Sequence, residues 1–231
     1  MNAHHPLIDQ SNGLELFQSV AEFNLYLIRY IHPSWLKTVK LSPLVQQLRQ
    51  ENNADYHLSH YLLKQFQLNN EFDYEFIENH KRIALADEGE LTALALYTGA
   101  TLNEGIIRNA LLSSQRQAFA ECLGEPLYRF ATQKAQFIAR FDQQLGPSLL
   151  IDWDHLEQFK HYLLLSGLQV LGTAFSSCPE AFKKRLLLKM PTDYREHLES
   201  SELQNLSEEQ CQKLLIKVYK EVNKEWHHLL S

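Results

Sequence analysis

Histidine is the residue type in this sequence with the widest chemical use, because it binds metals and transfers protons near neutral pH. The chain has 11 histidines, of which His57 and His60 lie three residues apart and would share one face of a helix. A zinc site needs further ligands at fitting spacing, and no HExxH motif accompanies the pair. We therefore interpret the pair as polar residues on a helix surface and expect no bound metal.

Motifs for nucleophilic catalysis and phosphate binding are incomplete or absent. Ser34 and Lys37 match the SxxK pattern of serine acyl-enzymes, but the companion SDN and KTG motifs do not occur. The chain also has no GxSxG, GxxxxGK[ST] or GxGxxG sequence. Asp152 and Asp154 are paired carboxylates, which we attribute to capping of a helix. We therefore expect no catalytic residues and no cofactor, and we expect that the protein is not an enzyme.

Composition narrows the possible partners and the compartment. With 231 residues, of which 45% are apolar, the chain can bury a sizeable core without disulfides. Its net charge of −6 argues against nucleic acid as a ligand. The basic run from Lys183 to Lys189 is interpreted as a helix with a solvated basic side. Three scattered cysteines, no signal-peptide pattern and no apolar run of about 18 residues predict a cytoplasmic protein without membrane insertion.

Helix signals recur along the whole chain. Capping boxes begin at Asp87, Asp154 and Ser207, where a short polar side chain precedes an acid or amide by three residues. Gly124 is expected to end one helix, and the next begins with Pro126 in its first turn. A final helix is predicted from Glu208 to about Leu229. The fold class is therefore all-α, with roughly ten helices and at most a minor hairpin.

The chain shows no repeat and no low-complexity linker, which favours a single compact domain over residues 1–231. A polar stretch over residues 67–80 marks a possible boundary. It would separate an N-terminal lobe, residues 1–72, from a main helical bundle, residues 73–231.

The stretch NLYLIRYIHPSWL, residues 24–36, concentrates five aliphatic and three aromatic side chains around one arginine and one histidine. We expect its aliphatic side chains to lie in the core. Burying arginine or histidine without partners is costly, and aromatic residues and arginine are enriched in interface hot spots. Four residues are therefore predicted to lie at a docking surface or to support one: Arg29, Tyr30, His32 and Trp35.

The same stretch resembles the opening signature of the SctK/YscK family, the accessory proteins of the type III secretion sorting platform. The resemblance continues at ALALYTGATLNEGIIRNALLSSQRQAFAECLGEPLYRFA, residues 93–131, where a helix ending in Gly99 precedes a short helix and a Leu-Gly pair. It extends more weakly to Pro191. Leu27 stands where many relatives carry proline, which leaves open whether the preceding helix breaks there.

The resemblance implies an adaptor without catalytic activity. It would link the cytoplasmic domain of the inner-membrane ring protein, SctD, to the pod protein, SctQ, and through the pod to the stator and the ATPase. It would lie in the cytoplasm, peripheral to the inner membrane at the base of the secretion apparatus. Two alternatives remain open: a helical secretion chaperone that binds exported proteins, and an all-α metal-dependent hydrolase built on some of the histidines.

Overall fold

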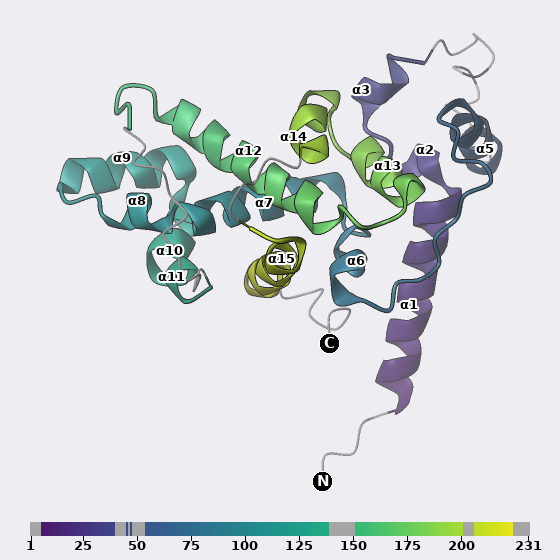
Figure 1. Cartoon of the computed structure of the whole chain (residues 1–231), viewed down its shortest axis with the longest axis horizontal. Helices are drawn as coiled ribbons and strands as arrows, with labels where there is room; N and C mark the ends of the chain where they lie inside the picture. Colours follow the sequence, from purple (N-terminus) through teal and green to yellow (C-terminus); the bar gives the residue numbers. More distant parts are fainter. Residues whose placement is uncertain are drawn as a thin grey trace. The chain divides into compact units, whose positions relative to one another are not determined.

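The computed structural model describes residues 6–39, 45, 47, 54–138, 151–200 and 206–223, with side chains from residue 13 onward. Within these ranges every regular element is a helix, and no strand occurs (Figure 1). The all-α fold class is confirmed. The described residues form fourteen α-helices and one 3₁₀-helix. This exceeds the predicted ten because several helices are only four or five residues long. The predicted helix end near Leu229 lies outside the described residues.

The chain groups into two compact units. Unit 1 comprises residues 1–88, 177–195 and 225–231, and unit 2 comprises residues 89–176 and 196–224. The chain therefore leaves unit 1 within one helix and returns to it later. Residues 177–195, which were predicted to belong to the main bundle, group with the N-terminal residues in unit 1. Whether the chain behaves as one domain remains a prediction.

Unit 1 is built around a short helix that contacts three others. Helix α2 (Leu27–Tyr30) packs against α1 (Pro6–Leu25), α5 (Asp55–Gln65) and α13 (Glu180–Lys189). Three short elements complete the described part of this unit: α3 (Pro33–Leu36), α6 (Asn79–Ile83) and the 3₁₀-helix η1 (Thr192–Tyr194). Because α13 comes from the second half of the sequence, unit 1 depends on long-range packing.

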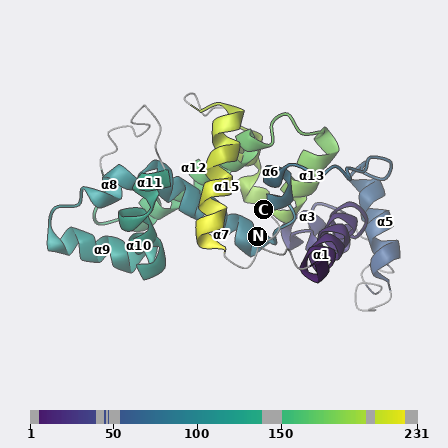
Figure 2. The same ribbon diagram turned by 90° about the horizontal axis from the view of Figure 1, so that it is seen from below.

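Unit 2 is organised around α12 (Leu156–Ala174), which packs against α15 (Glu208–Val222) (Figure 2). It also packs against α9 (Ser113–Leu123). Helix α10 (Glu125–Gln133) packs on α8 (Glu104–Arg108), α9 and α11 (Ala135–Ile138). Helices α7 (Glu88–Leu102) and α14 (Arg195–Glu199) complete its described part. The apolar stripe of α15, formed by Leu214, Leu215 and Val218, is buried.

Two helices of unit 2, α7 and α12, approach each other closely. A Cβ atom on Gly99 would lie 1.8 Å from the carbonyl oxygen of Leu163, and one on Gly167 would lie 1.7 Å from that of Ala95. No side chain fits at either glycine, so the two backbones are in direct contact. Gly99 was predicted to end its helix, which was wrong, because α7 continues to Leu102.

The structure agrees with some of the predicted helix starts and ends and contradicts others. α7 begins at Glu88, directly after Asp87. Gly124 separates α9 from α10 at a φ of 84°, a conformation that favours glycine. The prediction of a cap at Asp154 was wrong: the N-cap residue of α12 is His155, whose side chain forms no capping hydrogen bond. Asp152 instead accepts a hydrogen bond from the backbone N–H of Asp154 at 3.0 Å, in the turn before the helix.

The third capping box, at Ser207, is confirmed. The Ser207 hydroxyl accepts a hydrogen bond from the N–H of Gln210 at 3.3 Å, and the Gln210 side chain accepts one from the N–H of Ser207 at 2.8 Å. We expect Ser207→Ala to lower the free energy of unfolding by about 1 kcal/mol. Urea denaturation followed by circular dichroism measures this. Ser114→Ala, at an exposed position inside α9, is the control; equal stability of the two variants would contradict the prediction.

Candidate partner-binding site

The segment over residues 24–36 folds as three successive short pieces. Helix α1 ends at Leu25, and Tyr26, with φ −114° and ψ 55°, breaks the helix before α2 begins at Leu27. The break therefore forms with leucine at position 27. His32 then caps α3, its Nδ1 accepting a hydrogen bond from the N–H of Ser34 at 3.2 Å, and Pro33 occupies the first helical position.

Three of the five aliphatic residues of this segment lie in the core of unit 1, as expected, and Leu25 and Ile28 are half-buried. Leu27, Ile31 and Leu36 are buried in one cluster with leucines of α5 and with Leu188 of α13. The cluster joins residues more than 150 positions apart in the sequence. Burial of this size stabilises each side chain by about 1.5–3 kcal/mol, so the segment is firmly held.

Trp35 belongs to the same cluster and not to the surface. Its side chain is 8% exposed, and its indole N–H donates a hydrogen bond to the carbonyl oxygen of Met190 at 2.8 Å. Two neighbouring contacts reinforce this attachment. The N–H of His32 donates to the carbonyl oxygen of Leu188 at 2.8 Å, and the hydroxyl of Ser34 accepts from the N–H of Thr192 at 3.0 Å. These residues fix the end of α13 against α3.

Tyr30 also points into unit 1. Its hydroxyl donates a hydrogen bond to the carbonyl oxygen of Phe23 at 2.6 Å, and its ring stacks on that of Phe23 with centroids 5.9 Å apart. Burial raises the pKa of the Tyr30 hydroxyl above its usual range. Tyr30 therefore helps to hold α2 against Phe23 of α1.

Arg29 is the one predicted site residue of the four that is exposed. Its Nε donates to Asp55 of α5 at 2.9 Å, its guanidinium lies 4.4 Å from the Tyr26 ring centroid, and Glu22 is 3.8 Å away. The hydrogen bond to Asp55 raises the pKa of Arg29, so the group stays charged. The four residues thus lie in one segment, but only Arg29 can present its charged group to a partner directly.

The basic run over residues 183–189 was interpreted as the solvated side of a helix, and this is wrong for two of its cations. Arg185 and Lys189, one helical turn apart on α13, are both buried, at 0% and 4% exposure. The Lys189 ammonium donates to the carbonyl oxygens of Ala84, Leu85 and Ala86 at 2.8, 3.1 and 2.9 Å. It also lies 5.3 Å from the Phe23 ring centroid and 5.2 Å from that of Tyr30.

Arg185 connects the same helix to the residues that follow α5. Its Nη2 donates to the carbonyl oxygen of Leu68 at 3.2 Å, and its guanidinium lies 5.7 Å from the ring centroid of Phe72. Desolvation by burial lowers the pKa of Arg185. A sequence signal for both cations existed: residues 182, 185, 186 and 189 recur at helical spacing, which puts Arg185 and Lys189 on the face of Phe182 and Leu186.

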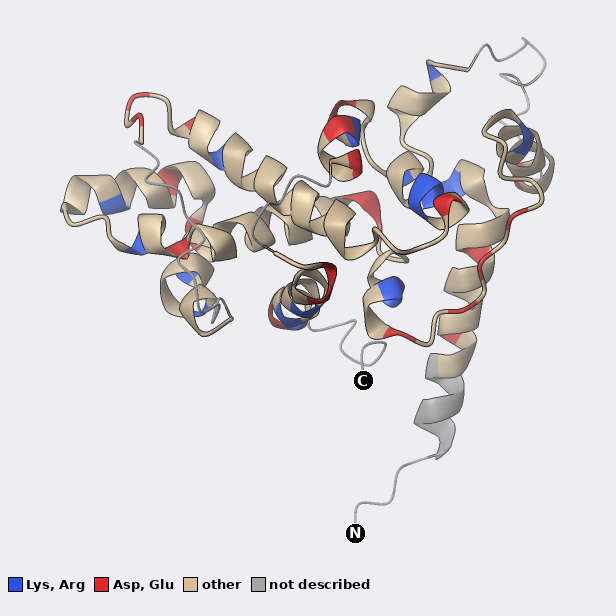
Figure 3. Ribbon diagram, viewed as in Figure 1, with Lys and Arg blue, Asp and Glu red and all other residues tan. Residues whose placement is uncertain are grey.

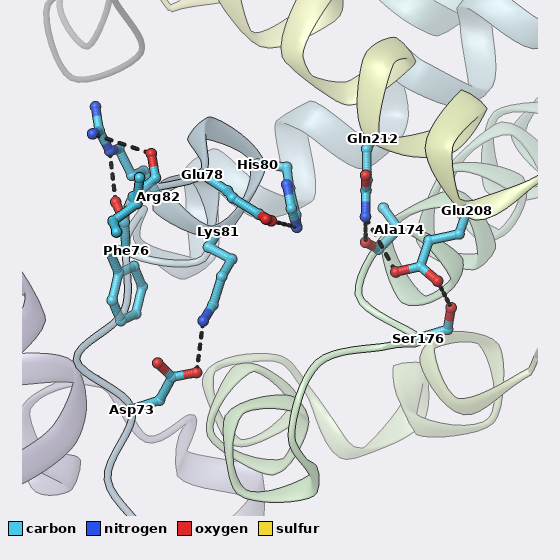
Figure 4. A network of polar contacts seen from close by, with 11 residues as sticks. Asp73, Phe76, Glu78, His80, Lys81, Arg82, Ala174, Ser176, Glu208 and Gln212 are labelled. Carbon is cyan, nitrogen blue, oxygen red and sulfur yellow. Dashed lines mark hydrogen bonds and ion pairs between the residues drawn. The ribbon is translucent and has the colours of Figure 1, made fainter.

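Residues 71–78 are the later part of the chain between α5 and α6, have no regular secondary structure, and are called the α5–α6 connector. The carboxylate of Asp73 pairs with the ammonium of Lys81 at 2.8 Å (Figure 4). Arg82 donates to the carbonyl oxygen of Phe76 at 2.9 Å, and Glu78 lies 3.3 Å from His80. Figure 4 also shows a polar cluster of unit 2, in which Gln212 donates to Ala174 and Glu208 accepts from Ser176.

The histidines considered as metal ligands do not come together with others in the described residues. His57 and His60 are exposed on α5. No group of three or more His, Cys, Asp or Glu residues in the described ranges could hold a metal ion. Among the helices that the structure describes, none has both the length and the apolar character needed to cross a bilayer.

The regular elements of the described residues are thus all helical, and the segment over residues 24–36 packs in unit 1 with the charged Arg29 exposed. The sequence matches the profile of the family "YOP proteins translocation protein K (YscK)" over residues 19–231, so the chain belongs to the YscK family, as the sequence resemblance predicted. A solved structure of the cytoplasmic domain of the T3SS sorting platform protein PscK from P. aeruginosa is similar in fold. That similarity has a TM-score of 0.55 and 21% identity and covers 89% of this chain and 95% of the other. The comparison with curated proteins gave no match.

Proposed function

We propose that this protein is a non-enzymatic adaptor of the cytoplasmic sorting platform of a type III secretion system. It links the cytoplasmic domain of an SctD-like ring protein to an SctQ-like pod protein, peripheral to the inner membrane. The observation that carries this proposal is the family match over residues 19–231. The similarity in fold to a sorting platform protein over 95% of that chain supports it.

Arg29 is the residue that we propose to contact a partner in the segment over residues 24–36. Its guanidinium is exposed, and Asp55 and Tyr26 restrict its orientation, so little side-chain entropy is lost on binding. Tyr30, His32 and Trp35 hold the backbone that carries it, through their contacts with Phe23, Leu188 and Met190. Their role is to support the docking surface.

The direct test is binding of the purified full chain to the SctD cytoplasmic domain and to the SctQ protein of the same organism. We expect both to bind, and all three proteins to form one complex on gel filtration. Binding to neither would overturn the adaptor function. Binding to exported proteins, without either of these components, would favour the secretion chaperone instead.

Separate substitutions at Arg29 and Trp35 distinguish contact from support. We expect Arg29→Ala to weaken binding of one partner by about 1–3 kcal/mol. Its folding should change by less than about 1 kcal/mol, because the lost ion pair is exposed. Trp35→Phe leaves the Met190 carbonyl without its donor and should lower stability by about 1–3 kcal/mol. Thermal melts with binding titrations measure both; unchanged binding by the Arg29 variant would remove it from the interface.

A further inference from the structure

We infer that the α5–α6 connector, residues 71–78, is a docking surface for a basic segment of a partner protein that also carries apolar side chains. This inference rests on the proposed function, because an adaptor needs surfaces on which its partners dock. It concerns residues that lie outside the segment over residues 24–36. Three properties of the connector support this role: its anchoring, its exposed apolar side chains and its charge.

The connector is anchored although it has no regular secondary structure. The side chain of buried Asn24 accepts a hydrogen bond from the N–H of Asp73 at 2.8 Å and donates one to the carbonyl oxygen of Asp73 at 2.7 Å. The Asp73 carboxylate is almost buried in its pair with Lys81. Phe76 packs between Phe23 and Phe182, with centroid distances of 5.7 and 5.8 Å. A segment fixed at these points loses little conformational entropy when a partner binds.

Next to these anchors in the sequence, the connector presents large apolar side chains to solvent. Phe72, Tyr74 and Ile77 are 43%, 57% and 83% exposed. The rings of Phe72 and Tyr74 lie 6.2 Å apart. Three exposed apolar residues within six positions on a fixed backbone are unlike the scattered single residues of an ordinary surface, and such groups mark interaction sites.

The charge of the connector selects the chemistry of the partner. Glu71, Glu75 and Glu78 are exposed, and neither Glu71 nor Glu75 forms an ion pair within the described residues. The nearest cations are occupied. Lys81 pairs with Asp73, Arg82 binds two backbone carbonyl oxygens, and the buried Arg185 donates to the carbonyl oxygen of Leu68. In Figure 3 the loop between α5 and α6 is marked by acidic positions and has no basic one. The surface is therefore apolar and negative.

A negative surface with aromatic and aliphatic side chains fits lysine or arginine next to leucine-like residues in a protein segment. Opposite charge increases the association rate, and the apolar contacts slow dissociation. An anionic membrane is the other apolar target, but it would repel the three glutamates. Nucleic acid would be repelled for the same reason. We therefore commit to a basic, apolar segment of a protein partner.

Two pairs of variants test the inference in the full chain. Glu71→Lys with Glu75→Lys reverses the charge, and its control is Glu121→Lys with Glu209→Lys, exposed glutamates in unit 2. Tyr74→Ser with Ile77→Ser removes apolar surface, and its control is Tyr56→Ser with Leu111→Ser at equally exposed positions. Titrations use the SctD cytoplasmic domain, the SctQ protein and a synthetic helical peptide with lysine on one face and leucine on the other.

We expect both connector variants to bind one of the two proteins at least about 10-fold more weakly, and both controls to bind it as the parent chain does. Raising the salt concentration from about 0.05 to about 0.5 M should reduce the loss of affinity caused by Glu71→Lys with Glu75→Lys, and not the loss caused by Tyr74→Ser with Ile77→Ser. If the parent chain binds a protein and the connector variants bind it equally well, the docking surface is refuted while the adaptor function stands.

If the parent chain binds neither protein, the adaptor function is refuted. Binding of the synthetic peptide then tests the docking surface on the connector. Weaker peptide binding by the connector variants alone supports the surface, whereas equal binding by all variants refutes it. The last measurement is co-sedimentation of the parent chain and the variants with vesicles of anionic lipid. Binding to vesicles that is lost on Tyr74→Ser with Ile77→Ser would replace the protein partner by a membrane.

Discussion

Gly167→Ala is expected to destabilise unit 2 by about 4 kcal/mol or more. The added methyl group would meet the carbonyl oxygen of Ala95 at 1.7 Å and its carbonyl carbon at 2.5 Å. Both are backbone atoms of α7, so no side chain can rotate away, and the two helices must separate. Inserting one methylene into a packed core costs about 1–3 kcal/mol when neighbours adjust, and this site exceeds that range because they cannot. Gly99→Ala should behave alike, since its methyl would meet Leu163 at 1.8 Å.

Gly105→Ala is the matched control for this prediction. Gly105 lies in α8, and a Cβ there would have nothing within 4 Å. Alanine also favours a helix over glycine by about 0.5–1 kcal/mol, so the control should be neutral or slightly more stable. Because the chain has two units, hydrogen exchange resolved to α7 and α12 is the suitable measurement. Protection of these helices that is unchanged by Gly167→Ala would contradict the close approach.

Local sequence signals predicted where several helices begin and end. The cap at Ser207 and the break at Gly124 depend on residues that are neighbours in the chain, so a short window contains all the information. The signal at Asp154 failed: the Asp152 carboxylate, two residues earlier, contacts the N–H of Asp154 and the ring of His155, and α12 begins only after His155. Which of two short polar residues forms such a contact is not resolved by spacing alone.

The contacts that fix the candidate site could not be predicted from local sequence. Trp35 is buried because Met190 accepts its indole hydrogen bond, and these residues are 155 positions apart. The prediction that aromatic residues and arginine of this segment lie at a surface rested on residue type. Type does not reveal which backbone carbonyl will be available once the chain folds. Arg29 differs only because its partners, Glu22 and Asp55, are themselves on the surface side of their helices.

Lys189→Ala is the second substitution for which we expect a large effect, a loss of about 3–5 kcal/mol in the stability of unit 1. The Lys189 ammonium is the shared donor for three consecutive carbonyl oxygens, those of Ala84, Leu85 and Ala86, which follow α6. Removing it leaves buried acceptors that have lost this donor, each a cost of about 1–3 kcal/mol, and opens a cavity beside Phe23 and Tyr30.

Lys189→Met separates the lost donors from the lost volume. Methionine fills a similar space, so a remaining loss of about 2–4 kcal/mol would measure the ammonium and its three hydrogen bonds. Lys184→Ala, on the same helix at a half-buried position, is the control and should cost about 1 kcal/mol or less. Urea titrations with hydrogen exchange on α6 report each variant. If Lys189→Met is as stable as the parent chain, the cost of burying the charge offsets all three bonds. The lysine would then be retained for the orientation of α13 against α6 and not for stability.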